Sequence, residues 1–258
     1  MALGDPVFNL STRDKQIGWS SHDRSERLTN ILDAYVLGAL PPYNMLLGGK
    51  VAACLVKTRD VYFDFLKTYG NKAGTISKKD KSPKLLAVTT SSSLGRSSVY
   101  NRLKIGDEEY FRSIGYTTGW GHFHIPDNMF KDMRAYLRTI GHPYADNHAY
   151  GDGPNWRFRT IRTALRELGL SEHLLRHGVQ REVFWCPLAE NAEELLLTGN
   201  GSPNIANLLS AAEVSSLAKE RWMLPRSYRN QQYRAWERSR ITALLEQKST
   251  RGVIAVAS

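Results

Sequence analysis

The chain has 258 residues, 41% of them hydrophobic and six of them tryptophan, so it can bury a sizeable core and is not generally disordered. It has two cysteines, no signal peptide and no apolar run that could span a membrane, which predicts a cytoplasmic protein in a reducing compartment with no membrane partner. An excess of Lys and Arg gives a formal charge of +10, which is typical of proteins that bind a polyanion. The alternative is that the charge only keeps the protein soluble.

The first seventy residues predict short strands followed by two helices. Residues 1–19 indicate two short strands joined by a polar turn, and residues 20–29 a short helix or a loop. Residues 30–40 are predicted to form a strand, because the double proline that follows forbids its continuation. Helical spacing of apolar residues predicts helices over 43–57 and 60–69.

Polar, aromatic and glycine residues are densest between residues 85 and 126. The apolar run 85–90 predicts a buried strand of the parallel type, followed by a serine-rich turn and a short helix over 99–104. This order directs backbone N–H groups at one spot, which suits a phosphate or another anion, although helix capping alone also explains the serines. A strand is predicted to resume at 114–117, and alternation over 122–125 places two histidines on one face of a strand.

Candidate catalytic groups lie in this stretch. A serine could act as nucleophile, or the histidines as general acid and base with a phenol or amide group orienting them, on a phosphodiester or acyl substrate. The residues concerned are Ser97, Ser98, Tyr100, Asn101, His122 and His124. Ordinary surface histidines are the alternative, and since two histidines do not complete a metal site, no metal is predicted and the cofactor stays unknown.

Basic and aromatic side chains around the turn predict contacts with nucleic acid. Cations neutralise phosphate groups and aromatic rings stack on bases. The cations are Lys78, Lys79, Lys81, Arg96 and Arg102, and the rings are those of Tyr100 and Trp120. A solvated basic loop is the alternative for the lysines.

Residues 127–187 predict the rest of an α/β core. Helices are expected over 127–140, 156–168 and 171–177, and the strand 182–187 is predicted to complete the sheet. The second of these helices carries an arginine face, which a solvated surface helix also explains. The predicted fold class is therefore α/β, with a mixed sheet flanked by helices over residues 1–187.

The character of the chain changes at residue 188, where a basic helical extension, 188–258, is predicted. It includes a short acidic helix over 191–197 and mostly helical structure over 204–247, broken at Pro225. Aromatic residues alternate here with arginines, which favours nucleic-acid binding, whereas packing of the extension on its own core is the alternative. The residues chosen for contact are Arg226, Arg229, Arg234 and Trp236.

Four blocks of this sequence resemble the Druantia anti-phage protein A family of prokaryotes, over roughly residues 5–200. In chain order they are PVFNLSTRDKQIGWSSHDR (6–24), LDAYVLGALPPYNMLLGGKVAACLV (32–56), LLAVTTSSSLGRSSVYNRLK (85–104) and YFRSIGYTTGWGHFHIP (110–126). The resemblance implies a role in defence against phage or carriage by mobile elements, with partners such as a helicase. Longer family members carry a region before the first block, which predicts a natural short form or part of a longer protein.

The order of predicted elements also resembles the second half of an acetyltransferase-like fold. The glycine-containing loop that binds acyl-CoA in that fold is absent from the corresponding stretch, PPYNMLLGGKVA, so no acetyl-CoA use is predicted. We therefore expect a nucleic-acid-binding component of a phage-defence system or mobile element, with DNA favoured over RNA. The alternatives are an enzyme acting at the serine and histidine residues, and a scaffold that assembles defence proteins.

Overall fold

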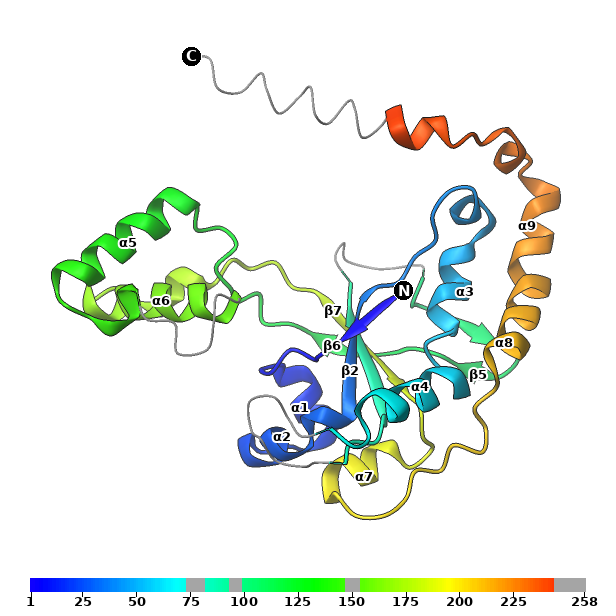
Figure 1. Ribbon diagram of the computed structural model, residues 1–258, viewed down its shortest axis with the longest axis horizontal. Helices are drawn as coiled ribbons and strands as arrows, with labels where there is room; N and C mark the ends of the chain where they lie inside the picture. Colours follow the sequence, from blue (N-terminus) through cyan, green and yellow to red (C-terminus); the bar gives the residue numbers. More distant parts are fainter. Residues whose placement is uncertain (73–81, 93–98, 147–153, 244–258) are drawn as a thin grey trace. The chain divides into compact units, whose positions relative to one another are not determined.

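The computed structural model describes residues 1–72, 82–92, 99–146 and 154–243. The chain divides into two compact units, the first formed by Met1–Gly115 with Val183–Ser258 and the second by Tyr116–Glu182 (Figure 1). This division differs from the predicted domains 1–187 and 188–258, and that boundary stays a prediction.

A mixed five-stranded sheet, in the order β1-β2-β3-β7-β6, runs through the first unit (Figure 1). β2 and β3 are parallel, whereas β1 pairs with β2, and β7 with β3, in the antiparallel direction. The strands are β1 (Ala2–Gly4), β2 (Ile31–Val36), β3 (Ala87–Ser91), β6 (Arg112–Tyr116) and β7 (Glu182–Pro187), beside a small hairpin of β4 (Lys104–Ile105) and β5 (Glu108–Glu109). The predicted α/β class with a mixed sheet flanked by helices is confirmed.

Nine α-helices have both ends in the described residues, with shorter 3-10 or π turns between them, and residues 239–243 are also helical. The helices are α1 (Ser11–Ile17), α2 (Ser21–Arg27), α3 (Gly48–Cys54), α4 (Arg59–Tyr69), α5 (Asp127–Thr139), α6 (Pro154–Glu167), α7 (Ala192–Thr198), α8 (Ala211–Ala218) and α9 (Leu224–Arg229). The turns are η1 (Leu28–Asn30), η2 (Tyr43–Leu46), η3 (Pro143–Ala145), η4 (Glu172–Leu175), η5 (Lys219–Met223) and η6 (Gln232–Ala235).

Each face of the sheet packs against its own set of helices. On one face, Leu32 and Val88 join residues of α3, α4 and α8 in the larger core cluster. On the other face, Ile31, Ala87 and Trp185 pack against residues of α1 and α7. Successive strand residues point to opposite faces, so a strand that is buried on both sides reads as an uninterrupted apolar run.

Three local predictions in the first half of the chain are wrong. Residues 1–19 contain one strand and the helix α1, because Arg13, Asp14 and Ile17 are buried at helical spacing. Residues 99–102 form a turn, not the start of a helix, and Arg102 there has a left-handed φ of 64°. Residues 122–125 are bends and turns, so no strand places His122 and His124 on one face.

Pro225 does not break the C-terminal helix. The backbone stays right-handed from α8 through the π turn η5 into α9, where Pro225 occupies a first-turn position. Proline has no N–H to donate, and a widened π turn before it accommodates the missing hydrogen bond. The helix therefore continues to Arg229.

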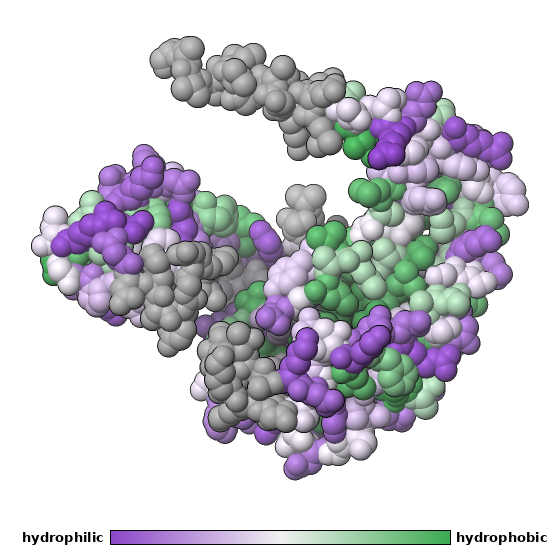
Figure 2. Space-filling view, viewed as in Figure 1, coloured by the Kyte–Doolittle hydropathy of each residue, from purple (hydrophilic) through white to green (hydrophobic). Residues whose placement is uncertain are grey.

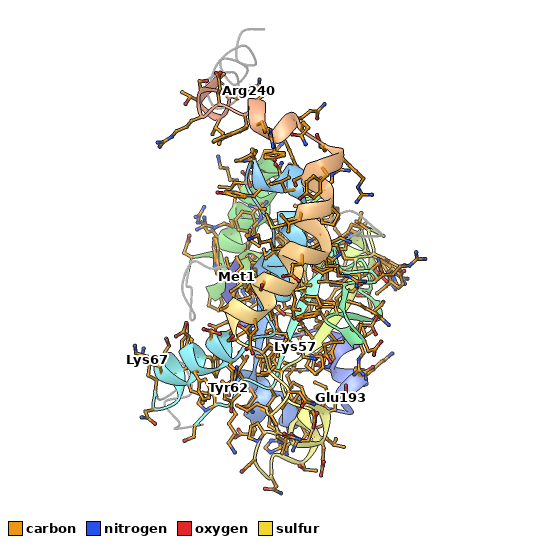
Figure 3. The ribbon with its side chains drawn as sticks, turned by 90° about the vertical axis from the view of Figure 1, so that its right-hand side faces the viewer. Met1, Lys57, Tyr62, Lys67, Glu193 and Arg240 are labelled. Atoms are coloured by element: carbon orange, nitrogen blue, oxygen red, sulfur yellow. The ribbon has the colours of Figure 1, made fainter. Side chains whose placement is uncertain are left out.

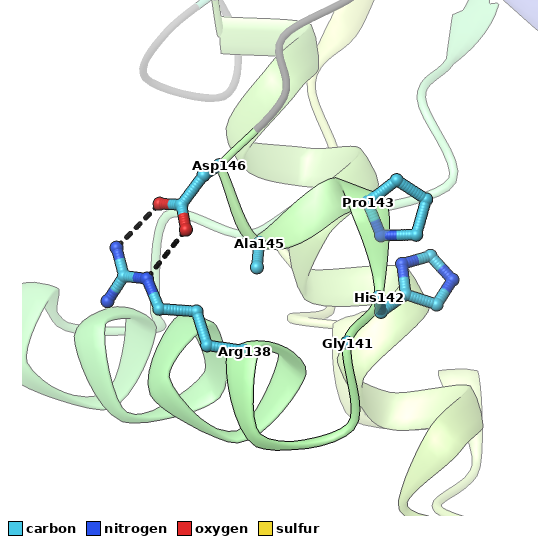
Figure 4. Close-up of a pocket in the computed structure, with 6 residues that line it drawn as sticks. All are labelled: Arg138, Gly141, His142, Pro143, Ala145 and Asp146. Atoms are coloured by element: carbon cyan, nitrogen blue, oxygen red, sulfur yellow. Dashed lines mark hydrogen bonds and ion pairs between the residues drawn. The ribbon is translucent and has the colours of Figure 1, made fainter.

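The second unit is built on a hairpin of α5 and α6. Phe130, Ile161 and Leu165 share one apolar cluster, and Leu137 and Ala164 share another. Asp146 closes the end of α5, because its carboxylate accepts hydrogen bonds from Arg138 at 2.6 and 2.7 Å (Figure 4). It also accepts a hydrogen bond from Arg134 at 2.8 Å. These bonds lower the pKa of Asp146 to about 2, with the Arg138 bond as the largest cause.

Two buried charged residues hold the segment after β1 against the sheet. Asp33, only 7% exposed on β2, accepts hydrogen bonds from the Val7 N–H at 2.8 Å and from the Thr89 hydroxyl. Arg13, fully buried, donates to the carbonyls of Val7 and Phe8 and to the carboxylate of Asp14. Burial raises the pKa of Asp33, while its hydrogen bonds and Arg13 oppose the rise.

Two replacements of Asp33 distinguish the contribution of its hydrogen bonds to stability from that of its charge. Asp33→Ala should lower the free energy of unfolding by about 1 to 3 kcal/mol, because the Val7 N–H and Thr89 hydroxyl lose a buried acceptor. Asp33→Asn keeps an acceptor and removes the ionisation that burial disfavours, so at neutral pH it should cost less than about 1 kcal/mol. Because the folded pKa is raised, the unaltered protein should lose stability relative to Asp33→Asn as pH rises above the unfolded pKa. Urea unfolding across pH measures this, and equal losses in both variants would contradict it.

Asp146 should make the stability of the α5–α6 hairpin depend on pH in the acid range. Its pKa is lowered, so the stabilisation is present above the unfolded pKa near 3.8 and is lost as pH falls towards about 2. A carbon-13 NMR titration of the Asp146 carboxyl should show a midpoint near pH 2, and Asp146→Asn should remove the matching shift changes in α5 amides. Asp132→Asn removes the same charge from α5 at a residue without an ion pair in the described structure, and it should leave those changes intact. The hydrogen bonds from Arg134 and Arg138 to Asp146 are here called the Asp146 clamp, and an Asp146 midpoint near pH 4 would refute it.

Candidate nucleic-acid interface

The predicted site residues are divided between the two units. Tyr100, Asn101 and Arg102 lie in the first unit, and Trp120, His122 and His124 lie in the second. The remaining predicted residues of the serine-rich turn and the basic loop lie outside the described residues, namely Lys78, Lys79, Lys81, Arg96, Ser97 and Ser98.

Tyr100 and Asn101 face the core of the first unit, whereas Arg102 faces solvent. The Tyr100 ring packs 5.3 Å from the ring of Phe111 and 5.1 Å from that of Phe184, and burial raises its pKa. The side-chain nitrogen of Asn101 is buried and has no hydrogen-bond partner in the described structure. Packing therefore accounts for Tyr100, and Arg102 keeps an exposed side chain that can meet an anion.

His122 and His124 have different surroundings within the second unit. The half-buried ring of His122 lies 5.6 Å from Phe158, and burial, together with the nearby charges of Arg157 and His124, lowers its pKa. The exposed His124 shares a 2.8 Å hydrogen bond between its Nε2 and the Leu174 carbonyl, which can only accept, so Nε2 carries the proton. In the described part of the chain, no three His, Cys, Asp or Glu side chains gather as metal ligands.

A hollow of about 440 Å³ lies beside the Asp146 clamp in the second unit (Figure 4). Arg138 and Asp146 line one side of it, and Gly141, His142 and Pro143 line the other. The guanidinium and the carboxylate already satisfy each other, and the His142 Nδ1 accepts the Tyr144 N–H at 3.2 Å. These bonds stabilise the corner between α5 and η3 and leave no reactive pair of groups facing the hollow.

Residues 211–240, here called the C-terminal arm, pack on the first unit along one stripe. Val214 and Ala218 are fully buried, and Trp222 packs against the core cluster one helical turn further on. The Lys50 ammonium lies 5.3 Å from the centre of the Trp222 ring, and the Arg226 Nε donates to the Met45 carbonyl at 3.2 Å. The opposite side of the arm is left to solvent, as Figure 3 shows for the helices leading to Arg240.

Residues 219–240 of the arm carry half of the net charge of the whole chain. Between residues 219 and 240 there are two glutamates and seven cations, which are Lys219, Arg221, Arg226, Arg229, Arg234, Arg238 and Arg240. None of the seven forms an ion pair with a carboxylate of the described residues. Hydrophilic side chains accordingly gather over α9 and the residues that follow it (Figure 2).

The arginines of the α5–α6 hairpin contrast with those of the arm. Arg157 pairs with Asp127 at 2.7 Å, and Arg162 pairs with Glu172 at 2.9 Å. Arg134 and Arg138 share Asp146. Carboxylates therefore neutralise most of the hairpin's positive charge, whereas the positive charge of the arm stays available to a polyanion.

Aromatic rings accompany the free cations of the arm. Tyr228 is 78% exposed, and the rings of Tyr233 and Trp236 are half-buried. The predicted residues Arg226, Arg229, Arg234 and Trp236 all lie on this arm. Arg229 and Arg234 are exposed, as are Tyr228, Arg238 and Arg240, whereas Arg226 and Trp236 are half-buried. Residue patterns do not show which arginines are paired with carboxylates, because ion-pair partners such as Arg157 and Asp127 lie 30 residues apart in the sequence.

No helix among the described residues is both long enough and apolar enough to cross a membrane. No solved structure matches this chain.

A family model described as Druantia protein DruA matches residues 1–198. The chain is also 59% identical to Druantia protein DruA of Escherichia coli (strain UMEA 4076-1) over 237 residues, which are 92% of this chain and 59% of that relative. It thus spans about three fifths of the relative's length, and because 237 exceeds 198 the similarity continues into the C-terminal arm. The chain therefore belongs to the Druantia protein DruA family.

Proposed function

We propose that this chain is a nucleic-acid-binding component of a Druantia system that defends prokaryotic cells against phage. The observation that carries the proposal is the C-terminal arm, where seven cations without carboxylate partners in the described structure alternate with aromatic rings. Family membership supplies the defence setting. A cytoplasmic location and a helicase partner belong to the same proposal.

The physical basis is the release of counterions. Each phosphate that a protein cation neutralises frees condensed salt ions, so affinity falls steeply as salt rises. An arginine already paired with a carboxylate contributes little, because the carboxylate must first be displaced. The unpaired cations of the arm meet this requirement, and an exposed ring such as that of Tyr228 offers a face for base stacking.

The serine-rich turn keeps a supporting role in the proposal. Arg102 is exposed, and Arg96, Lys78, Lys79 and Lys81 remain predicted phosphate contacts. DNA is preferred to RNA. Catalysis by Ser97 or Ser98 with His122 or His124, and the likeness to half of an acetyltransferase, remain predictions that no contact in the described residues favours.

Removing arginines from the arm should weaken binding more than removing them from the hairpin. The triple variant Arg229→Ala, Arg234→Ala, Arg238→Ala should bind labelled duplex DNA at least about tenfold more weakly at moderate salt. Its slope of log affinity against log salt should fall by roughly three, about one for each lost phosphate contact. Fluorescence anisotropy across a salt series, with Mg²⁺ present and products checked for cleavage, measures both quantities.

A matched control removes the same charge elsewhere. The triple variant Arg138→Ala, Arg162→Ala, Arg166→Ala takes three arginines from carboxylate pairs of the second unit. Exposed pairs contribute little to stability, so this variant should fold normally and keep the salt slope of the unaltered protein. Equal weakening by both triple variants would show that binding follows net charge and would overturn the role of the arm.

A further inference from the structure

Two segments of the second unit, residues 117–125 and 174–181, lie side by side and are here called the glycine ribbon. The Gly119 carbonyl accepts the N–H groups of His177 at 2.9 Å and Gly178 at 3.1 Å. The Thr117 N–H donates to the Arg181 carbonyl, and the Gly121 N–H donates to the Leu175 carbonyl, both at 2.9 Å. Segments more than 50 residues apart in the sequence are thus held together by backbone hydrogen bonds.

Gly119 permits this close approach. Its φ is +67°, and a Cβ added to it would lie 3.0 Å from the carbonyl carbon of Gly178. A side chain at this position would therefore be strained and would push the two segments apart. The absence of a side chain at Gly119 keeps the two backbones in contact.

Three aromatic rings are fixed on the surface of the ribbon. The Phe123 ring, in a residue that is 65% exposed, lies 4.5 Å from the ring of His177, which lies 6.1 Å from that of His124. His124 is held by the Leu174 carbonyl, and the His177 Nδ1 accepts the Val179 N–H at 3.1 Å. An exposed phenylalanine beside two anchored imidazoles is an ordered aromatic surface that is already formed before any ligand binds.

Trp120 and Arg176 stand together on this ribbon. They face each other across an isolated antiparallel bridge, so their side chains lie on the same side of the paired backbones. Trp120 is 40% exposed, and Arg176 and Arg181 are also exposed. Neither arginine pairs with a carboxylate of the described structure, in contrast to the arginines of the neighbouring hairpin.

We propose that the glycine ribbon binds single-stranded nucleic acid, with Phe123 and Trp120 stacking on bases and Arg176 and Arg181 contacting phosphates. This inference rests on the proposed nucleic-acid binding and specifies its substrate class. Bases in a duplex are already stacked and paired, whereas an unpaired strand presents base faces to flat side chains. The free arginines beside the rings favour this anionic ligand over an apolar peptide.

The test uses the full chain and two probes of equal length, a labelled oligothymidylate and a labelled duplex. The double variant Trp120→Ala, Phe123→Ala should bind the oligothymidylate at least about tenfold more weakly, because stacking contributes roughly fivefold or more in affinity per base. Its duplex affinity should change less than threefold. Trp120→Phe with Phe123→Tyr retains the rings and should restore most of the single-strand affinity.

Ultraviolet crosslinking adds a readout that does not depend on affinity. The oligothymidylate should crosslink to peptides containing Trp120 or Phe123, identified by mass spectrometry. Arg176→Ala with Arg181→Ala should lower the single-strand salt slope by about one to two, since each phosphate contact contributes about 0.7. Circular dichroism and thermal unfolding confirm that each variant is folded.

The outcomes separate this inference from the proposed function. If the ring variant binds oligothymidylate unchanged and the arm triple variant loses binding, the binding role of the ribbon is overturned and that of the arm is kept. Loss in the ring variant with an unaffected arm variant would support the ribbon and overturn the arm. Equal loss for both probes would overturn the preference for single strands, and failure of the unaltered chain to bind either probe at low salt would overturn both proposals.

Discussion

The parallel pairing of β2 with β3 is the constraint on which the rest of the first unit depends. Parallel neighbours cannot be joined by a tight turn, so the chain crosses over through α3 and α4 and covers one face of the sheet. That crossover provides the surface on which Val214 and Trp222 of the C-terminal arm pack. The opposite face is covered by α1 and α7, and the buried pair Asp33 and Arg13 ties the segment after β1 to it.

Arginine has two different roles in this protein, and tertiary contacts separate them. On the hairpin, Arg138 and Arg162 bind carboxylates and stabilise local structure. On the arm and the glycine ribbon, residues such as Arg229 and Arg176 have no carboxylate partner in the described structure. The unpaired set presents less competition to a polyanion, because no neighbouring carboxylate has to be displaced. The cations behind the net charge of +10 are therefore not all equally accessible to a polyanion.

Much of the fold could be predicted from residue patterns, and the failures have identifiable causes. The periodicity of apolar residues predicted α4, α5, α6 and the strand β7 within one or two residues of their observed bounds. It failed near Ile17 and Trp19, because a short helix packed on a sheet and two short strands have similar apolar spacing. It failed again at His122, where alternation in four residues was too short to specify a strand.

The sequence alone determined the α/β class, the family and the position of the arginine-rich arm, because these depend on local composition, periodicity and ordered blocks of residues. The tertiary structure alone decided which cations are paired, since Arg157 meets Asp127 only after α6 folds against α5. It also determined the pairing of the two segments of the glycine ribbon, because hydrogen bonds from His177 and Gly178 to Gly119 join segments that no local pattern connects. Contacts between distant residues follow from packing, and no short window of sequence contains them.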